Sequence, residues 1–91
     1  MTTITVTAQH IARGERYSWV CCPVALAIRD ALPDVSVVRV RGGGRLTLGD
    51  TPRLVTLALP GAAVNFIRDF DDGPGGEPFT FDLDYPAEVA A

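Results

Sequence analysis

The residues with the most reactive side chains lie in the stretch RYSWVCCPVALA, residues 16–27, where Cys21 and Cys22 are adjacent. Neighbouring cysteines rarely bond to each other, because a disulfide needs Cα atoms roughly 4.4–6.8 Å apart. Cys22 is expected at a helix N-cap, where exposed amides and the helix dipole stabilise a thiolate. One hypothesis is therefore a thiol-dependent redox or nucleophilic protein that uses Cys22, with Cys21 or the single histidine, His10, assisting.

The alternative for both cysteines is packing, since free cysteine behaves as a small apolar group and is among the most buried residue types. Zinc sites need about four ligands, and two cysteines with one histidine at this spacing match no zinc motif. We favour packing, and we predict no metal ion, no cofactor and no catalytic residue for this chain.

Arginine side chains gather around a predicted hairpin. Arg39 and Arg41 alternate on one face of a predicted strand, and Arg45 follows the turn formed by residues 42–44. Three guanidinium groups there could hold a carboxylate, a phosphate or an acidic protein, or they could form a solvated sheet face. The sequence GGGR is not a P-loop, because it lacks the spacing and the lysine of that motif.

Two large aromatic residues, Tyr17 and Trp19, stand in the polar segment before the cysteines. Aromatic residues in loops are enriched at protein interfaces because they bury a large area at a small entropy cost. They could equally cover a small core. Together with the three arginines, they are the candidate partner-binding residues.

Acidic residues close the second predicted helix at Asp69, Asp71 and Asp72, and recur at Asp82 and Asp84 in the last predicted strand. Carboxylates are unfavourable at a helix C-terminus. The segment DDGPGGE does not match the calcium-binding loop of an EF-hand. We interpret these residues as solubilising charge.

The elements that position these residues follow from the periodicity of apolar residues. Alternation with period two predicts strands, and apolar stripes at i, i+3 and i+4 predict helices. The predicted strands are 2–7, 35–41, 45–48, 54–59 and 78–85, and the predicted helices are 23–32 and 60–72, with one helical turn over 8–14. The order β-α-β-β-β-α-β predicts one α+β domain over residues 1–91, a two-layer sandwich of two helices on a mostly antiparallel sheet of four to five strands.

The composition excludes several classes of protein. Hydrophobic residues make up 47% of the 91 residues, too many for a disordered chain. The net charge of −3 disfavours nucleic acid as a partner, because phosphate contacts supply most non-specific affinity. No apolar run reaches the roughly 18 residues of a membrane span, and the N-terminus lacks the features of a signal peptide. We therefore expect a cytoplasmic protein without membrane contact.

Three stretches resemble a group of small uncharacterised proteins encoded by actinobacterial phages: TITVTAQHIARG, CPVALAIRDAL, and LPGAAVNFIRDFDDG followed by PFTFDLD. All eight basic residues are arginine, which agrees with the codon usage of a GC-rich genome. In this group a second cysteine often lies a few residues before CPVALA, whereas Cys21 here adjoins Cys22. The resemblance implies a location in the host cytoplasm and carries no established activity, so no residue inherits a catalytic role.

Three hypotheses follow from the sequence. The first is a small non-enzymatic accessory protein that binds a host or phage protein and could also form a homo-oligomer. It is motivated by the lack of a complete catalytic set and by a size that offers surface more readily than a cleft. The second is the thiol-dependent protein described above, and the third is a protein that sequesters a small ligand.

Overall fold

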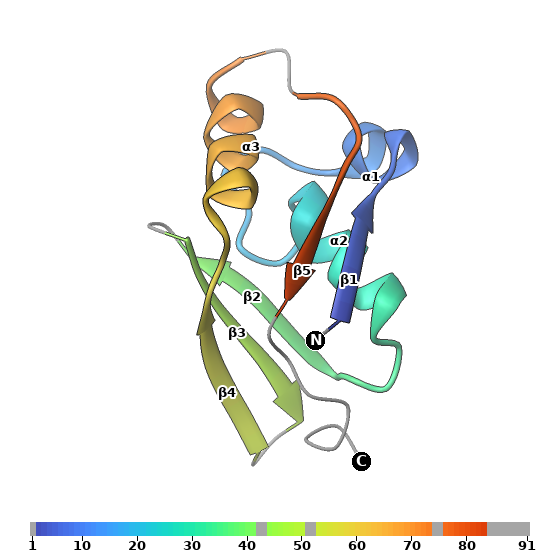
Figure 1. Ribbon diagram of the computed structural model, residues 1–91, viewed down its shortest axis with the longest axis vertical. Coiled ribbons are helices and arrows are strands. Elements are labelled where there is room, and N and C mark those ends of the chain that lie inside the picture. The colour runs from blue at the N-terminus through green and yellow to red at the C-terminus, as the bar shows by residue number, and fades with distance from the viewer. Residues whose placement is uncertain (1, 42–43, 51–52, 74–75, 84–91) are drawn as a thin grey trace.

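The elements follow the predicted order, and the helical turn after the first strand forms a short helix of its own (Figure 1). The structure is a computed structural model that describes residues 2–41, 44–50, 53–73 and 76–83. Its elements are β1 (Thr2–Val6), α1 (Ala8–Arg13), α2 (Pro23–Ala31), β2 (Val37–Arg41), β3 (Arg45–Asp50), β4 (Arg53–Ala58), α3 (Gly61–Asp72) and β5 (Phe79–Leu83). The predicted α+β class is confirmed.

The five strands form two antiparallel sheets, where the sequence predicted a single sheet. One sheet pairs β1 with β5, and Ile4 lies opposite Phe81. The other is the predicted meander β2-β3-β4, in which Val40 lies opposite Leu46. The helix α2 packs against both β1 and β2, so the two sheets share one hydrophobic core.

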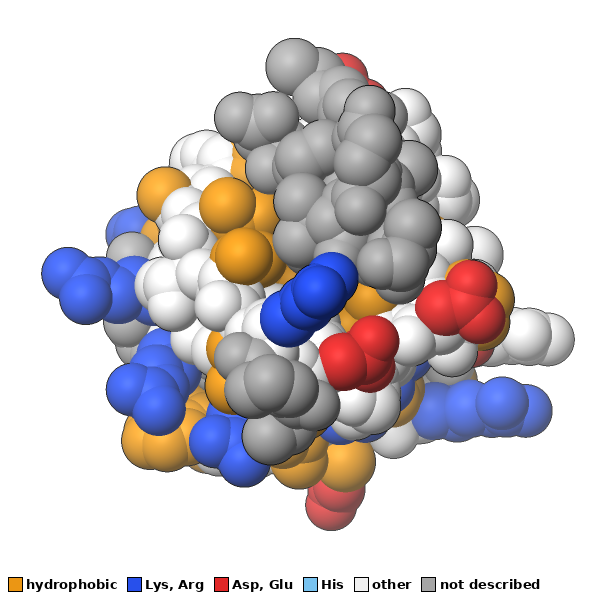
Figure 2. Space-filling model, turned by 90° about the horizontal axis from the view of Figure 1, so that it is seen from below, with side chains coloured by type: hydrophobic (Ala, Val, Ile, Leu, Met, Phe, Trp, Pro, Cys, Tyr) orange, Lys and Arg blue, Asp and Glu red, His pale blue; other side chains and the backbone are white. Residues whose placement is uncertain are grey.

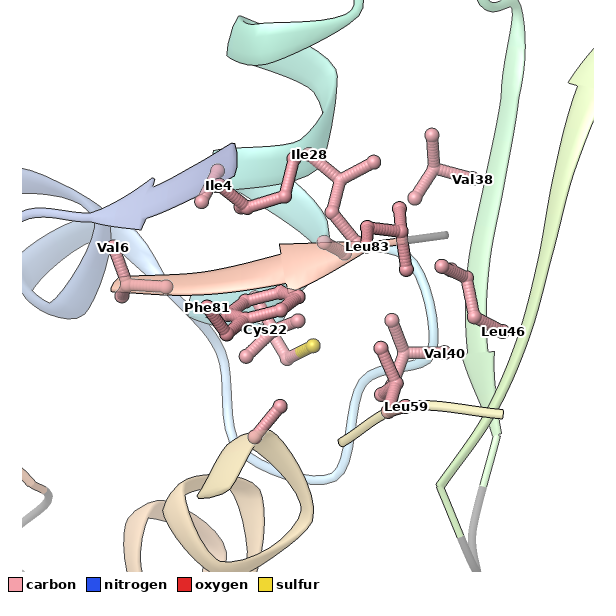
Figure 3. Close-up of a cluster of buried hydrophobic side chains, with 14 of the residues drawn as sticks. Ile4, Val6, Cys22, Ile28, Val38, Val40, Leu46, Leu59, Phe81 and Leu83 are labelled. Atoms are coloured by element: carbon pink, nitrogen blue, oxygen red, sulfur yellow. The ribbon is translucent and has the colours of Figure 1, made fainter. Parts of the chain in front are cut away.

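The hydrophobic core lies where α2 meets the two sheets (Figure 3). Val24 and Ile28 of α2 are fully buried, as the nearly all-apolar sequence of this helix predicts. The strands contribute their inward-facing residues, namely Ile4, Val6, Val38, Val40, Leu46, Leu48, Phe81 and Leu83. The predicted alternation is confirmed in β5 by buried Phe81 and Leu83, whereas Tyr85, the last residue of the predicted strand, lies outside the described residues.

The element boundaries differ from the predictions by one or two residues at most ends. Cys22 is the N-cap of α2 and Pro23 its first residue, as predicted. Pro60 caps α3 instead of opening it, and β2 begins at Val37 instead of residue 35. Gly49 and Asp50, which lie between two predicted strands, belong to β3, and Gly49 is paired with Val37. Residues 42–43 and 51–52 lie outside the described residues, as do Asp84 and the end of the predicted last strand.

Candidate binding site

The segment between α1 and α2, residues 14–22, holds both predicted aromatic residues and both cysteines, and we call it the aromatic loop. Two internal hydrogen bonds fold it back on itself: Glu15 N–H donates to the carbonyl of Cys21 (2.8 Å), and Cys21 N–H donates to Ser18 Oγ (3.0 Å). These two hydrogen bonds bring the ends of the loop together and fix the conformation of the backbone between Glu15 and Cys21.

The aromatic loop is also tied to its neighbours through its backbone. Val40 N–H of β2 donates to the carbonyl of Trp19 (2.7 Å), and Arg29 Nη1 of α2 donates to the carbonyl of Val20 (2.6 Å). Tyr17 N–H donates to Asp71 Oδ1 of α3 (2.9 Å). Three elements of the fold, α2, β2 and α3, thus hold the loop in one conformation.

Three side chains of the loop, those of Tyr17, Trp19 and Val20, are exposed to solvent although the backbone of the loop is held. Tyr17 is 72% exposed and Trp19 is 56% exposed, and Val20 between Trp19 and the cysteines is also exposed. Tyr17 adopts a left-handed conformation with φ of 57°, which costs a bulky residue of the order of 1 kcal/mol or more. Hydrogen bonds to Asp71 and Asp72 hold Tyr17 in this conformation, while most of its side chain stays exposed.

A hollow of about 220 Å³ lies beside the aromatic loop, and its lining includes Tyr17, Trp19, Cys22, Arg41, Ile67 and Asp71. Arg41 of β2 reaches it with its guanidinium over the Trp19 ring, where Cζ lies 5.4 Å from the ring centroid. Small-molecule sites usually span about 300–1,000 Å³. The hollow is therefore smaller than a typical ligand pocket and suits one inserted side chain.

The predicted arginines come together on the exposed face of the meander. Arg41 lies directly opposite Arg45, and Arg39 lies opposite Thr47 in the same register. Arg39 also lines a second hollow of about 180 Å³ together with Val20 and Arg29. Figure 2 shows arginine side chains gathered beside hydrophobic surface on the side where the meander lies. None of the three predicted arginines forms an ion pair with a residue that the structure describes.

The cysteines have little of the environment that a reactive thiol needs. Cys22 is 3% exposed, and this burial raises the pKa of its thiol, outweighing the helix amides of Ala25 and Val24 that lower it. The Sγ atom lies inside the core (Figure 3). Burial therefore favours the packing interpretation, and Cys21 is half-buried beside it.

His10, proposed to assist the thiol, has both ring nitrogens in other interactions. Nδ1 accepts a hydrogen bond from Thr7 N–H (3.0 Å) in a capping box that begins α1. Nε2 lies 2.6 Å from Asp30 Oδ2 of α2. The imidazole thus joins α1 to α2, and it is not positioned as a base for Cys22.

The acidic residues at the end of α3 face the aromatic loop. Asp71 accepts from the Tyr17 backbone, and Asp72 Oδ1 accepts from the Tyr17 hydroxyl at 3.4 Å. Asp82 instead accepts from Thr3 Oγ1 on the neighbouring strand (2.9 Å). Over the described ranges, no three His, Cys, Asp or Glu side chains are grouped in a way that could hold a metal ion.

Sequence reasoning missed Arg16, which joins the loop to α3. Its Nε donates to the carbonyl of Phe70 (3.0 Å) and its Nη2 to the carbonyl of Gly73 (2.6 Å). The sequence does indicate that such a residue is needed, because three aspartates near the C-terminus of a helix are stabilised by a cation from elsewhere in the chain. The position of that cation depends on the fold and could not be read from the sequence.

Comparison with known proteins adds nothing to this geometry: the chain matches no protein-family model, no curated protein and no solved structure. Within the described part of the chain, no helix combines the length and the apolar character needed to cross a membrane.

Proposed function

We propose that the protein is a small non-enzymatic accessory protein that binds a partner protein through Tyr17, Trp19, Val20 and Arg41. We call these four residues the aromatic surface. The observation that carries the proposal is the exposure of Tyr17 and Trp19 on a loop whose backbone is held by α2, α3 and β2. The resemblance to actinobacterial phage proteins makes a host or phage protein in the host cytoplasm the proposed partner.

The composition of this surface is that of a binding hot spot. Tryptophan, tyrosine and arginine are the residue types that carry most of the binding energy at protein interfaces. A loop already held in its bound conformation loses less entropy on association than a mobile one. The strained conformation of Tyr17 agrees with this role, because strain of this kind is found where side-chain presentation matters.

The positive charge beside the aromatic surface favours a partner with an acidic surface. Arg39, Arg41 and Arg45 are exposed on one side of the sheet, next to the aromatic surface, without ion pairs among the described residues. Complementary charge speeds association and selects among partners. The small volume of the hollow and the burial of Cys22 give less support to ligand sequestration or thiol chemistry.

The test is capture of a partner from an actinobacterial host lysate by the immobilised protein, followed by affinity measurement with the purified partner. Because Trp19 is the single tryptophan, its fluorescence should shift to shorter wavelength as the partner covers it. We expect Trp19→Ala and Arg41→Ala each to weaken binding by about tenfold or more, as hot-spot residues do.

Two matched variants separate binding from folding. Tyr17→Gly removes the aromatic ring but accepts the left-handed backbone without strain, so we expect weaker binding and an intact fold. Thr80→Ala changes an exposed residue of β5, away from the aromatic loop, and should bind as the unmodified protein does. If folded Trp19→Ala, Arg41→Ala and Tyr17→Gly bind the partner with unchanged affinity, the aromatic surface is not the binding site.

A further inference from the structure

The outer edge of β4 lies on the side of the meander opposite to the edge of β2 that contacts the aromatic loop. Among the strands that the structure describes, β4 pairs with β3 on one side and with no strand on the other. Figure 1 shows β4 at the outside of the meander. A strand in this position offers a row of backbone donors and acceptors to a further strand.

The hydrogen-bonding pattern between β3 and β4 identifies the residues whose backbone groups form this edge. Leu59 N–H donates to the carbonyl of Gly44 (2.7 Å), continuing the β3-β4 register. Backbone groups in an antiparallel strand alternate in direction, so the odd-numbered residues of β4 point toward β3. The N–H and C=O groups of Leu54, Thr56 and Ala58 consequently point away from the sheet.

The opposite edge of the same sheet is covered by the chain itself. Val40 N–H at the outer edge of β2 donates to the carbonyl of Trp19 (2.7 Å). Arg29 Nη2 approaches the carbonyl of Val38 at 3.4 Å. The fold therefore covers one edge of the meander, whereas no described residue covers the β4 edge in this way.

The β4 edge also lacks the features that usually prevent strand association. The sequence from Leu54 to Leu59, LVTLAL, contains no charged residue and no proline. The β3-β4 register runs without a bulge from Asp50 opposite Arg53 to Arg45 opposite Ala58. Leu54 is 44% exposed although it is a large apolar residue. Edges of monomeric proteins are commonly protected by charge, proline or bulges, so this edge is suited to pairing.

We propose that β4 pairs antiparallel with β4 of a second copy of this chain, across a two-fold axis at Thr56. In this register Thr56 lies opposite Thr56 of the second copy, and Leu54 lies opposite Ala58. All three outward-pointing residues then exchange backbone hydrogen bonds, and the two meanders form one continuous sheet of six strands. An interface of this type is self-complementary, as two-fold symmetry requires.

Side chains on both faces of the sheet fit this register. On the exposed face, Leu54 meets the small Ala58, and the Thr47–Thr56 hydroxyl contact (3.3 Å) continues into its symmetry equivalent. On the inner face, half-buried Val55 lies opposite half-buried Leu57 and both become covered. The single charge of β4, Arg53, lies at the far ends of the paired strands, so the like charges stay apart.

The first test is the molar mass in solution, measured by light scattering during size-exclusion chromatography over a range of protein concentration. We expect the unmodified protein to reach twice its chain mass of 9.7 kDa. Thr56→Pro removes one edge N–H without removing a β3-β4 hydrogen bond, and it should shift the protein to the monomer. The matched control Thr56→Val keeps the N–H and the β-branched shape, and it should remain a dimer.

A second variant and a second readout keep the test decisive. Leu54→Lys places a charge on the edge and should also give a folded monomer, even where Thr56→Pro fails to fold. In the dimer, the amide protons of Leu54, Thr56 and Ala58 should exchange more slowly with solvent than in the Leu54→Lys monomer. A monomer at all concentrations, or a dimer that persists in folded Thr56→Pro and Leu54→Lys, would overturn the proposal. Neither variant touches the aromatic surface, so this result is independent of partner binding.

Discussion

The guanidinium of Arg16 caps the C-terminal end of α3. Its Nε donates to the carbonyl of Phe70 (3.0 Å), and its Cζ lies 5.9 Å from the centroid of the Phe70 ring. The last turn of α3 contains no basic residue of its own. A cation near the C-terminus offsets the negative end of the helix dipole. Arg16 therefore supplies from the aromatic loop the positive charge that the last turn of α3 lacks, and it links the loop to this helix.

We predict that Arg16→Ala lowers the free energy of unfolding by about 1 kcal/mol, because it removes charge-assisted hydrogen bonds at a helix end. Arg16→Lys should recover only part of this loss, since an ammonium group cannot reproduce the forked geometry of a guanidinium. Urea unfolding measures both effects. Arg39→Ala, at an exposed position of β2, is the control for loss of one positive charge away from a helix end, and a loss equal to that of Arg16→Ala would contradict the capping role.

The burial of Cys22 predicts a pH dependence of stability. Its pKa is raised by desolvation, so the folded protein holds the thiol proton more tightly than the unfolded chain does. This contribution is complete below the pKa of an unfolded cysteine, about 8.5, and is lost as the pH rises toward the folded-state value. We therefore expect the free energy of unfolding of the unmodified protein to fall as the pH rises above about 8.5, the pKa of an unfolded cysteine.

Two cysteine variants assign this pH dependence to one thiol. Cys22→Ala should flatten the fall in unfolding free energy, whereas Cys21→Ala should retain it, because the other titrating groups are common to both proteins. Chemical denaturation at several pH values measures the slopes. Equal slopes in the two variants would mean that Cys22 is not the group responsible. Rapid alkylation of Cys22 in the folded protein would instead support the hypothesis of a thiol-dependent protein.

The local features of the fold were predictable from the sequence because they depend on local rules. Pro23 at the first position of α2, the alternation of Phe81 and Leu83, and the exposure of Arg39 and Arg41 follow from helix capping and strand periodicity. The division into two sheets was not predictable in this way. It depends on whether β5 returns to β1 or to the meander, and the strand patterns are the same in either arrangement.

The candidate site was predictable in its residue types but not in its geometry. The sequence predicts Tyr17, Trp19 and Arg41 as candidate partner-binding residues, yet the contact of Arg41 with the Trp19 ring depends on how the loop lies along β2. The contacts of Tyr17 with Asp71 and Asp72 join residues more than fifty positions apart. The spacing of apolar residues along the sequence does not predict such a contact. It does not predict the left-handed backbone of Tyr17 either.

Gly49 of β3 provides the sharpest prediction about stability because its conformation excludes a side chain. Its φ is 136°, and a Cβ placed there would lie 2.2 Å from the main-chain oxygen of Arg53 on β4. We predict that Gly49→Ala lowers the free energy of unfolding by about 2–4 kcal/mol, because the backbone must move to remove the clash. Gly61→Ala is the matched control, since a Cβ at that position meets nothing within 4 Å, and it should leave stability unchanged or raise it by up to about 1 kcal/mol. Urea unfolding compares the two variants, and similar unfolding free energies would mean that β3 and β4 do not approach each other at Gly49 as closely as the structure shows.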